Sequence, residues 1–432
     1  MTQLIKARQG IITPEVQQLA AVEGLAPEEL SQRVAQGRVV ILKNKGRQGM
    51  APVAVGERLR TKVNASIGTS SDCVDFEDEL KKLRVAGNAG ADTIMDLSTG
   101  GDIDGFRKQV LHSTTLPVGS VPIYQAAMES IAKRGSIVDM TAEDMFEVIE
   151  RHAADGVDFM AIHVALNQSV LERLKIQGRV TDIVSRGGAF LTGWMLHNDR
   201  ENPLYAQFDR VLEIARKYDV TLSIGDAIRP GCIADSLDRA QVQGLVVVGE
   251  MVQRALDAGV QVMVEGPGHV PADQVAATIL LQKQLCHRVP FFVLGTLVTD
   301  IAPGYDHITA AIGGTLAAMS GADFICYVTP AEHLRLPTAE DVHAGVIAAR
   351  IATHAADLVK GVQGAWEWDL AMAKARKALD WEKQIELAID PATAQRIRGE
   401  RNAAGAEACS MCGNYCAMKV VGEYLGKPKE NC

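Results

Sequence analysis

Three cysteines lie close together near the end of the chain, at Cys409, Cys412 and Cys416, in the spacing C-x2-C-x3-C. Three thiolates are one ligand short of a complete zinc site or a fully ligated 4Fe–4S cluster. Zinc sites usually pair a C-x2-C motif with a second, distant pair, and this sequence contains no such pair. The spacing therefore favours a 4Fe–4S cluster with one open iron. A zinc site completed by a histidine is the alternative. An open iron can chelate S-adenosylmethionine, which a reduced cluster splits to methionine and a 5′-deoxyadenosyl radical.

Two histidines follow different candidate strands. His269 lies in Glu265-Gly-Pro-Gly-His269, where the glycines let the backbone pass close to a ligand, and His333 lies downstream of Phe324–Val328. If both side chains reach one site, they can share a divalent metal such as zinc and leave coordination positions open. The alternative is that each imidazole is merely hydrogen-bonded.

Two glycine-bearing loops, Ser98–Gly101 and Ser185–Gly188, each follow a candidate strand. Glycines expose backbone N–H groups, and a following helix adds the positive end of its dipole, so such loops can bind an anion. Arg229 can add a bidentate phosphate contact. One such loop is weak evidence for an anion site, but several such loops around one pocket favour a small phosphorylated substrate.

The bulk properties restrict the class of protein. The chain has 432 residues, of which 47% are hydrophobic and 22% charged, with a net charge of −9. This charge argues against a nucleic-acid binder, and we expect no membrane span because no apolar run approaches about 20 residues. The first residues have no apolar signal core. Since the eight cysteines do not form a disulfide framework, we expect a reducing cytoplasm, with Cys232, Cys286 and Cys326 as plain buried thiols.

Short β-branched or apolar runs alternate with helical stretches from about residue 61, which predicts parallel strands with helical crossovers. Nine candidates favour an α/β fold built on a (β/α)8 barrel, with one candidate outside the ring or misread. A doubly wound sheet is the alternative. The candidate strands are Lys62–Ser66, Thr93–Leu97, Val118–Pro122, Phe159–His163, Asp182–Ser185, Thr221–Gly225, Gln261–Glu265, Phe291–Gly295 and Phe324–Val328.

Polar side chains recur where these candidate strands end. In a barrel the carboxyl ends of the strands and their loops form one shared mouth, so this recurrence predicts a polar funnel. The residues concerned are Asn64, Asp96, Tyr124, His163, Ser185, Asp226 and Glu265.

The remaining chain predicts two flanking parts. Residues 1–60 form a small α+β unit, with helix starts at Thr13-Pro14 and Ala26-Pro27 and a strand at Arg38–Leu42. Residues 61–335 form the barrel. Residues 336–432 form a helical region, with helices over 338–360 and 370–388 and a polar arm over 391–408 that carries the cluster.

Several motifs together resemble the thiamine pyrimidine synthase family, a group of non-standard radical S-adenosylmethionine enzymes. The resemblance covers residues 1 to about 425. The motifs that carry it are Met95–Gly101, Ile183–Gly188, Glu265–Pro271, Thr299–His307, Cys326–Pro330 and Cys409–Cys412. It implies a (β/α)8 barrel and a homodimer in which the cluster arm closes over the partner subunit's barrel. It also implies 5-aminoimidazole ribonucleotide as substrate and a low-potential electron donor.

The resemblance also implies residue roles. It assigns the cluster to Cys409, Cys412 and Cys416, and the divalent metal to His269 and His333. It implies acid–base roles for Glu265, Asp226 and Tyr124. The implied substrate contacts are Met95, Tyr124, His163, Ser185, Arg186, Gly187, Asp226, Arg229 and Glu265.

The chain departs from the family pattern in the pocket. Ser66 stands where the family usually has asparagine, Ala227 where it has glycine, Phe292 where it has tyrosine and Thr296 where it has proline. Compared with the family pattern, the residues expected to bind the cluster, the metal and the phosphate are kept. The residues expected near the part of the substrate that rearranges are changed. This favours the paralogue that turns the same ribonucleotide into 5-hydroxybenzimidazole for the cobalamin lower ligand, with Ser66 and Phe292 as further substrate contacts. The runner-up is the thiamine pyrimidine reaction, and a hypothesis of another class is an iron–sulfur electron carrier or redox sensor.

Overall fold

The computed structural model describes residues 1–401 and 407–425. The chain divides into two compact units, Met1–Lys360 and Gly361–Cys432. The described part contains no helix that is both long and apolar enough to cross a membrane.

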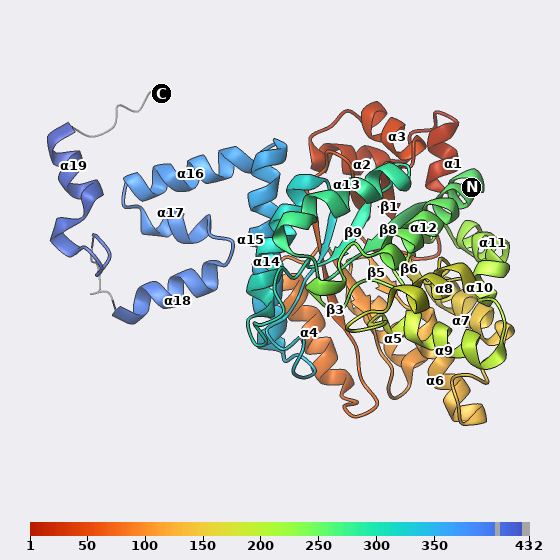
Figure 1. The fold of residues 1–432 in the computed structure, drawn as a ribbon. Coiled ribbons are helices and arrows are strands. Elements are labelled where there is room, and N and C mark those ends of the chain that lie inside the picture. Colours follow the sequence, from red (N-terminus) through yellow and green to blue (C-terminus); the bar gives the residue numbers. More distant parts are fainter. Residues whose placement is uncertain (402–406, 426–432) are drawn as a thin grey trace. The chain divides into compact units, whose positions relative to one another are not determined.

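A closed ring of eight parallel strands forms the centre of the first unit (Figure 1). The ring runs β10-β3-β4-β5-β6-β7-β8-β9, so the last strand closes on the first through Ile325 and Val63. Eight of the nine candidate strands are in this ring, which confirms the predicted barrel. The strands are β3 (Lys62–Ile67), β4 (Thr93–Asp96), β5 (Val118–Ser120), β6 (Phe159–Ile162), β7 (Thr221–Ile224), β8 (Val262–Gly266), β9 (Phe291–Leu294) and β10 (Phe324–Cys326).

The ninth candidate strand, Asp182–Ser185, is a loop, so this prediction was wrong. Asp182 has φ 49°, a left-handed conformation that interrupts an extended chain. The amides of Val180 and Thr181 donate to the Asp235 carboxylate at 3.0 Å rather than to a sheet. Ser185 is the N-cap of the next helix, and its hydroxyl accepts from the Gly188 amide at 3.2 Å. Side-chain caps therefore take the place of a strand ladder here.

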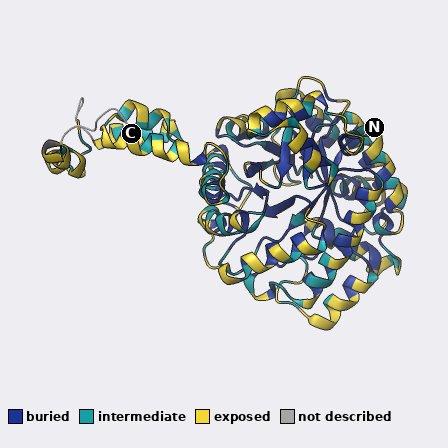
Figure 2. Ribbon diagram, turned by 90° about the horizontal axis from the view of Figure 1, so that it is seen from above, coloured by how far each residue is buried: buried dark blue, intermediate teal, exposed yellow. Residues whose placement is uncertain are grey.

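Helices surround the strands and bury their apolar faces against them. Figure 2 shows buried strands at the centre and exposed residues on the outer faces of the helices. The surrounding helices are α4 (Phe76–Asn88), α5 (Ile103–Ser113), α6 (Pro122–Arg134), α7 (Ala142–Asp155), α8 (Gln168–Gln177), α9 (Arg186–Asn198), α10 (Pro203–Ala206), α11 (Phe208–Tyr218), α12 (Arg239–Asp257), α13 (Val275–Leu285), α14 (Asp306–Ser320) and α15 (Ala339–Lys360), with 3-10 turns at Ile233–Asp235 and Ala272–Gln274.

A small α+β unit precedes the barrel, as predicted. It consists of α1 (Gln3–Arg8), α2 (Pro14–Glu23), α3 (Pro27–Ala35) and the antiparallel strands β1 (Val39–Leu42) and β2 (Val53–Gly56). Its helix α2 begins as expected, with the Thr13 hydroxyl accepting from the Val16 amide. Helix α1 and strand β2 were not predicted.

The leading unit contacts the amino ends of the barrel strands. The Asn44 amide donates to Asp158, which directly precedes β6, at 2.9 Å, and the buried Arg47 guanidinium pairs with the same carboxylate. The side chain of Gln261, just before β8, exchanges two hydrogen bonds with the backbone of Ile41. This end of the barrel is therefore closed by structural contacts, and the carboxyl end is left for chemistry.

The second unit is helical. It contains α16 (Ala365–Lys377), α17 (Trp381–Glu386), α18 (Pro391–Arg401), a 3-10 turn at Gly413–Tyr415 and α19 (Ala417–Leu425). The single helix predicted over 370–388 is wrong. The chain turns at Leu379, with φ 55°, and Asp380 caps a new helix. The arm predicted over 391–408 is helical to Arg401, and its residues 402–406, like Cys432, lie outside the described residues.

Candidate active site

A cavity of about 70 Å³ lies at the carboxyl ends of the barrel strands. Each of the eight barrel strands supplies residues to its lining, either from the strand or from the segment that follows. The barrel thus brings together side chains that are more than 250 positions apart in the sequence. The lining residues are Ser66, Met95, Leu97, Val121, Tyr124, Ala161, His163, Arg229, Glu265, Phe292, Val293, Leu294 and Cys326.

Most of the predicted substrate contacts lie in this lining. Ser66, Met95, Tyr124, His163, Arg229, Glu265 and Phe292 line the cavity directly. Asp226 lies beside Glu265 in an adjoining small cavity. The remaining three residues, Ser185, Arg186 and Gly187, contact the lining from the start of α9.

His163 connects the cavity to α9. The Ser185 hydroxyl lies 3.1 Å from Nε2 of His163, while Nδ1 is buried without a protein partner in the described chain. Burial, together with a smaller contribution from the nearby Arg229, lowers the pKa of His163 to about 3, so the ring is neutral. A Cβ at Gly187 would lie 2.4 Å from the ring, so only glycine lets the α9 N-terminus approach this closely. The unpaired Nδ1 suits a hydrogen bond to a ligand.

Tyr124 forms another wall of the cavity. Its ring packs edge-on against Phe190, with ring centroids 6.1 Å apart, and the Arg186 guanidinium lies 5.1 Å from the ring centroid. Burial raises the pKa of the Tyr124 phenol. The phenol therefore stays protonated and is a hydrogen-bond donor at neutral pH.

Two carboxylates and one guanidinium form the ionisable part of the site. Oε2 of Glu265 accepts from the Asp226 amide at 3.2 Å, and Oε1 of Glu265 lies 3.7 Å from the Arg229 guanidinium. Burial raises the pKa of Asp226 to about 7, with Arg229 opposing the rise and Glu265 adding to it. Burial also raises the pKa of Glu265. A carboxyl that titrates near neutrality can both donate and accept a proton, as acid–base catalysis requires.

His269 and His333 lie side by side, with ring centroids 5.4 Å apart. Nδ1 of His269 is 2.8 Å from Oδ1 of Asp300, and Nδ1 of His333 is 2.9 Å from Oδ1 of Asp306. Carboxylates on Nδ1 orient both rings and leave Nε2 as the atom able to coordinate a metal. Burial lowers the pKa of His269, against the influence of Asp300, and thus favours the neutral ligand form.

The pair fits two ligands of a metal site. Within residues 1–401 and 407–425, no three histidine, cysteine or acidic side chains converge as a complete site. Water or substrate would have to supply the other ligands, as in metal sites that keep open positions.

The three cysteines of the second unit lie on consecutive short turns. The Gly413 amide donates to the Cys409 carbonyl at 3.0 Å, and the Cys416 amide donates to the Gly413 carbonyl at 3.3 Å. Cys412 is exposed, and Cys409 and Cys416 are half-buried. These are three accessible thiols on a short, tightly turned segment, a donor set that suits an iron–sulfur cluster, and such ligands acquire their final geometry when the metal binds.

Comparison with known proteins identifies the group to which this arrangement belongs. The model of the radical SAM ThiC family matches residues 2–423. A phosphomethylpyrimidine synthase of Moorella thermoacetica is 63% identical over 432 residues, which is all of both chains. One of Desulforamulus reducens is 61% identical, also over all of both chains. The 5-hydroxybenzimidazole synthase BzaB of Moorella thermoacetica is 62% identical over 426 residues, 99% of this chain and 100% of its own.

The chain belongs to the radical SAM ThiC family. It is therefore an enzyme of thiamine- or cobalamin-related biosynthesis that uses an iron–sulfur cluster and S-adenosylmethionine. The resemblance stated from its motifs is confirmed.

Some residues of this ThiC-family site were not found from the sequence. Cys326 was predicted to be a plain buried thiol, but it lines the cavity, with Sγ 3.6 Å from the Ser66 hydroxyl. Burial raises the pKa of this thiol to about 11, so it stays protonated. Its place at the end of β10 was the available signal. Asp300 and Asp306 were missed as partners of the histidines, although both lie in Thr299–His307, one of the motifs that carry the family resemblance.

Asn64 and Asp96, two of the polar residues predicted at the mouth, have structural contacts instead. Oδ1 of Asn64 accepts from the Thr93 hydroxyl at 2.8 Å, and the amide side chain is fully buried. Oδ1 of Asp96 accepts from the Ser98 amide at 3.0 Å and shapes the loop after β4. That loop leads to a helix already capped by the Asp102 carboxylate, which argues against an anion site there.

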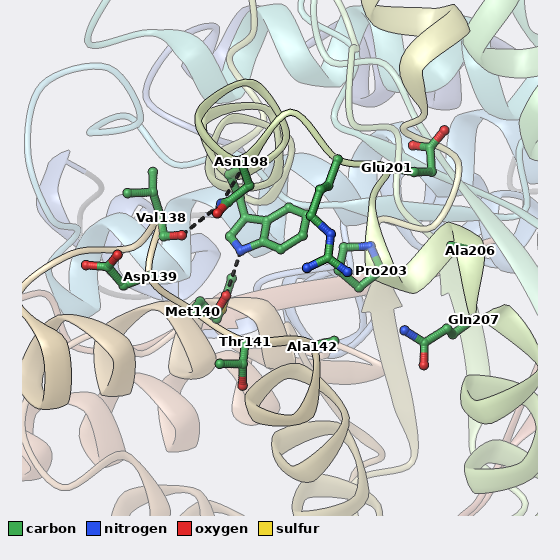
Figure 3. A pocket seen from close by; sticks show the side chains of 12 residues that line it. Val138, Asp139, Met140, Thr141, Ala142, Asn198, Glu201, Pro203, Ala206 and Gln207 are labelled. Atoms are coloured by element: carbon green, nitrogen blue, oxygen red, sulfur yellow. Dashed lines mark hydrogen bonds between the residues drawn. The ribbon is translucent and has the colours of Figure 1, made fainter.

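A larger hollow of about 470 Å³ lies away from the strand ends, between the segment after α6 and the helices α9 and α10 (Figure 3). Polar groups of its lining residues form hydrogen bonds with one another. The Trp194 indole donates to the Met140 carbonyl at 2.6 Å, and the Asn198 side chain donates to the Val138 carbonyl at 3.0 Å. In the part of the chain that the structure describes, no predicted site residue lines this hollow, so its size does not make it the active site.

Proposed function

We propose that this enzyme converts 5-aminoimidazole ribonucleotide to 5-hydroxybenzimidazole, as a radical S-adenosylmethionine carbon–carbon lyase. The observation that carries the proposal is the composition of the mouth cavity at Ser66 and Phe292. The Phe292 ring has no hydroxyl and stacks on Phe324, with centroids 4.1 Å apart. Apolar side chains of Leu294 and Val293 continue this wall.

The two candidate products differ in the number of polar groups that a pocket must satisfy. Hydroxymethylpyrimidine phosphate has an exocyclic amine, two ring nitrogens and a phosphate. 5-Hydroxybenzimidazole is a flat, uncharged bicycle with two ring nitrogens and one hydroxyl. A buried polar group without a partner costs free energy, so an apolar wall favours the product with fewer polar groups.

The chain's own residues would bind the substrate and move protons. The N-terminus of α9, at Arg186 and Gly187, offers amide donors and a positive dipole end to the ribonucleotide phosphate. His163 and Tyr124 orient the base and sugar by hydrogen bonds. Asp226 and Glu265 accept and return protons during the rearrangement, because burial raises the pKa of both carboxyl groups.

The donor sets of the chain support the cofactors of the proposal. Cys409, Cys412 and Cys416 would hold the iron–sulfur cluster, which with S-adenosylmethionine would supply the radical chemistry that removes a substrate hydrogen. His269 and His333 would hold a divalent metal, for which zinc suits two imidazoles. We further propose a homodimer with exchange of the cluster arm, a low-potential electron donor and a cytoplasmic location.

Phosphomethylpyrimidine synthesis is the second candidate. What favours it is the 63% identity to the Moorella thermoacetica phosphomethylpyrimidine synthase, marginally above the 62% to the BzaB protein of the same organism. Under this hypothesis the changes at Ser66 and Phe292 are neutral. An iron–sulfur carrier or sensor, the hypothesis of another class, has no need of the polar cavity and the paired histidines.

One anaerobic assay separates the three. The reconstituted enzyme is mixed with reductant, S-adenosylmethionine and 5-aminoimidazole ribonucleotide, and products are identified by mass spectrometry. We expect 5′-deoxyadenosine and 5-hydroxybenzimidazole. Hydroxymethylpyrimidine phosphate would instead support the second candidate, and a lack of deoxyadenosine would support the carrier.

Restoring polar groups to the cavity is expected to change the reaction. The double change Ser66→Asn and Phe292→Tyr should lower 5-hydroxybenzimidazole release at least about tenfold, because the added amide and phenol need partners that the benzimidazole does not supply. The matched control is Phe190→Tyr, which adds a phenol to the ring that packs against Tyr124. The measurement is the amount of each product, determined by mass spectrometry. The same product at the same rate would mean that neither position influences the outcome of the reaction.

A further inference from the structure

A second, smaller cavity lies behind the two carboxylates. It measures about 20 Å³, and its lining includes Asp226, Glu265, Gln282 of α13 and Gln241 of α12. Leu245, Val248 and Phe291 form its apolar walls. A space of this size holds one water molecule.

Gln282 has unmet hydrogen-bonding capacity at this place. Its side chain is fully buried, and in the described chain neither Nε2 nor Oε1 has a hydrogen-bond partner. Buried side-chain amides are nearly always bonded to protein or to ordered water, so an amide with both ends unpaired beside a cavity of this size indicates a water site. The other polar residue of α13 in the lining, Thr278, is already satisfied, since its hydroxyl donates to the Gln274 carbonyl at 3.0 Å.

We propose that one water molecule occupies this cavity, bridges the Gln282 amide to the carboxylates of Asp226 and Glu265, and makes Gln282 a positioning residue for the proton that these carboxylates exchange. Nε2 of Gln282 donates to the water oxygen, and the water donates to a carboxylate oxygen. Such a bridge is nearly as favourable as a direct hydrogen bond. It stabilises the ionised carboxylate and opposes part of the effect of burial.

The charged groups around Asp226 come from several segments. Arg229 follows it in the same loop, Glu265 lies in the last two residues of β8, and Arg179 comes from the loop before α9. The thiol of Cys286, at the end of α13, also senses the Asp226 charge. Gln282 differs from Arg229, Glu265 and Arg179 because it is uncharged, so it can favour the carboxylate without forming an ion pair with it.

A volume-matched change tests the proposal. In Gln282→Met the apolar side chain removes both ends of the bridge, and we expect the water to be lost and the pKa of Asp226 to rise by about one pH unit. The readouts are a high-resolution crystal structure and an infrared pH titration of the carboxyl band, assigned with Asp226→Asn, both on the full-length protein without substrate. Because neither readout uses a product, the result stands apart from the identity of the reaction.

Two variants frame the result. Thr278→Val removes a hydroxyl from the same cavity wall and should leave the water and the Asp226 titration unchanged. Gln282→Asn keeps the amide and should return the pKa of Asp226 most of the way to the parent value. A parent crystal structure without density in the cavity would overturn the proposal even if the variants do not fold, and so would a Gln282→Met protein that titrates like the parent.

Discussion

Replacing Asp226 with asparagine is expected to lower the rate of product formation by about 10²- to 10⁴-fold, the range typical for the loss of an acid–base group. Asparagine keeps the size and hydrogen-bonding shape of the carboxyl but cannot exchange a proton. The measurement is the single-turnover rate of the reconstituted enzyme with saturating substrate. A rate within a few-fold of the parent would contradict the role of Asp226 as a catalytic residue.

The same variant should be more stable than the parent at neutral pH. Burial raises the pKa of Asp226 to about 7, so the folded protein binds a proton here more tightly than the unfolded chain does. The stability from this group is complete below about pH 4 and is lost as the pH rises through 7, where the folded state must hold a buried charge. Asparagine is uncharged throughout. We therefore expect its advantage in the free energy of unfolding to grow by about 1–2 kcal/mol between pH 5.5 and 8, measured by urea unfolding.

Asp219 is the matched control. It lies just before β7, at the amino end of the barrel, and burial raises its pKa to about 6. It accepts from the Gln3 amide at 2.9 Å and from the Gln261 side chain at 3.2 Å. Asp219→Asn should change the pH dependence of unfolding but leave the turnover rate unaltered. Equal losses of turnover in both variants would mean that the effect of Asp226→Asn is structural.

Removing the carboxylates that orient the two histidines is expected to weaken metal binding by about 10- to 100-fold. In Asp300→Asn and Asp306→Asn the side chain can still accept one hydrogen bond, but it loses the negative charge that makes the imidazole more basic. Titration of purified protein with zinc against a chromophoric chelator measures the affinity without reference to turnover.

The control for the metal experiment is Asp273→Asn. Asp273 is exposed in the 3-10 turn Ala272–Gln274, a few residues beyond His269. Its substitution removes a negative charge from the same region but not a carboxylate that orients an imidazole ring. An unchanged zinc affinity in Asp300→Asn and Asp306→Asn would refute the orienting role of the carboxylates. If His269→Ala also binds zinc like the parent, the histidine pair is not the metal site.

Local patterns in the sequence were sufficient for the architecture and for most of the site. A β-branched run needs only its own residues to favour an extended chain, and parallel strands with helical crossovers close in few ways. Residues at strand ends, such as His163 and Glu265, could therefore be assigned to one mouth before any contact was known. The cysteine spacing and the glycine-rich motifs likewise identified the family, because each acts within a few residues of chain.

Other features depended on contacts between distant segments. The run Asp182–Ser185 has strand composition, but the Asp235 carboxylate and the cap of α9 hold it as a loop. Cys326 meets Ser66 only because β10 closes on β3, 260 positions away. The pairing of His269 with Asp300 depends on the backbone bridge from His269 to Leu297. Local composition determines each helix and strand and its caps. The partners of a buried polar group depend on closure of the barrel, because closure brings together residues that no local pattern connects.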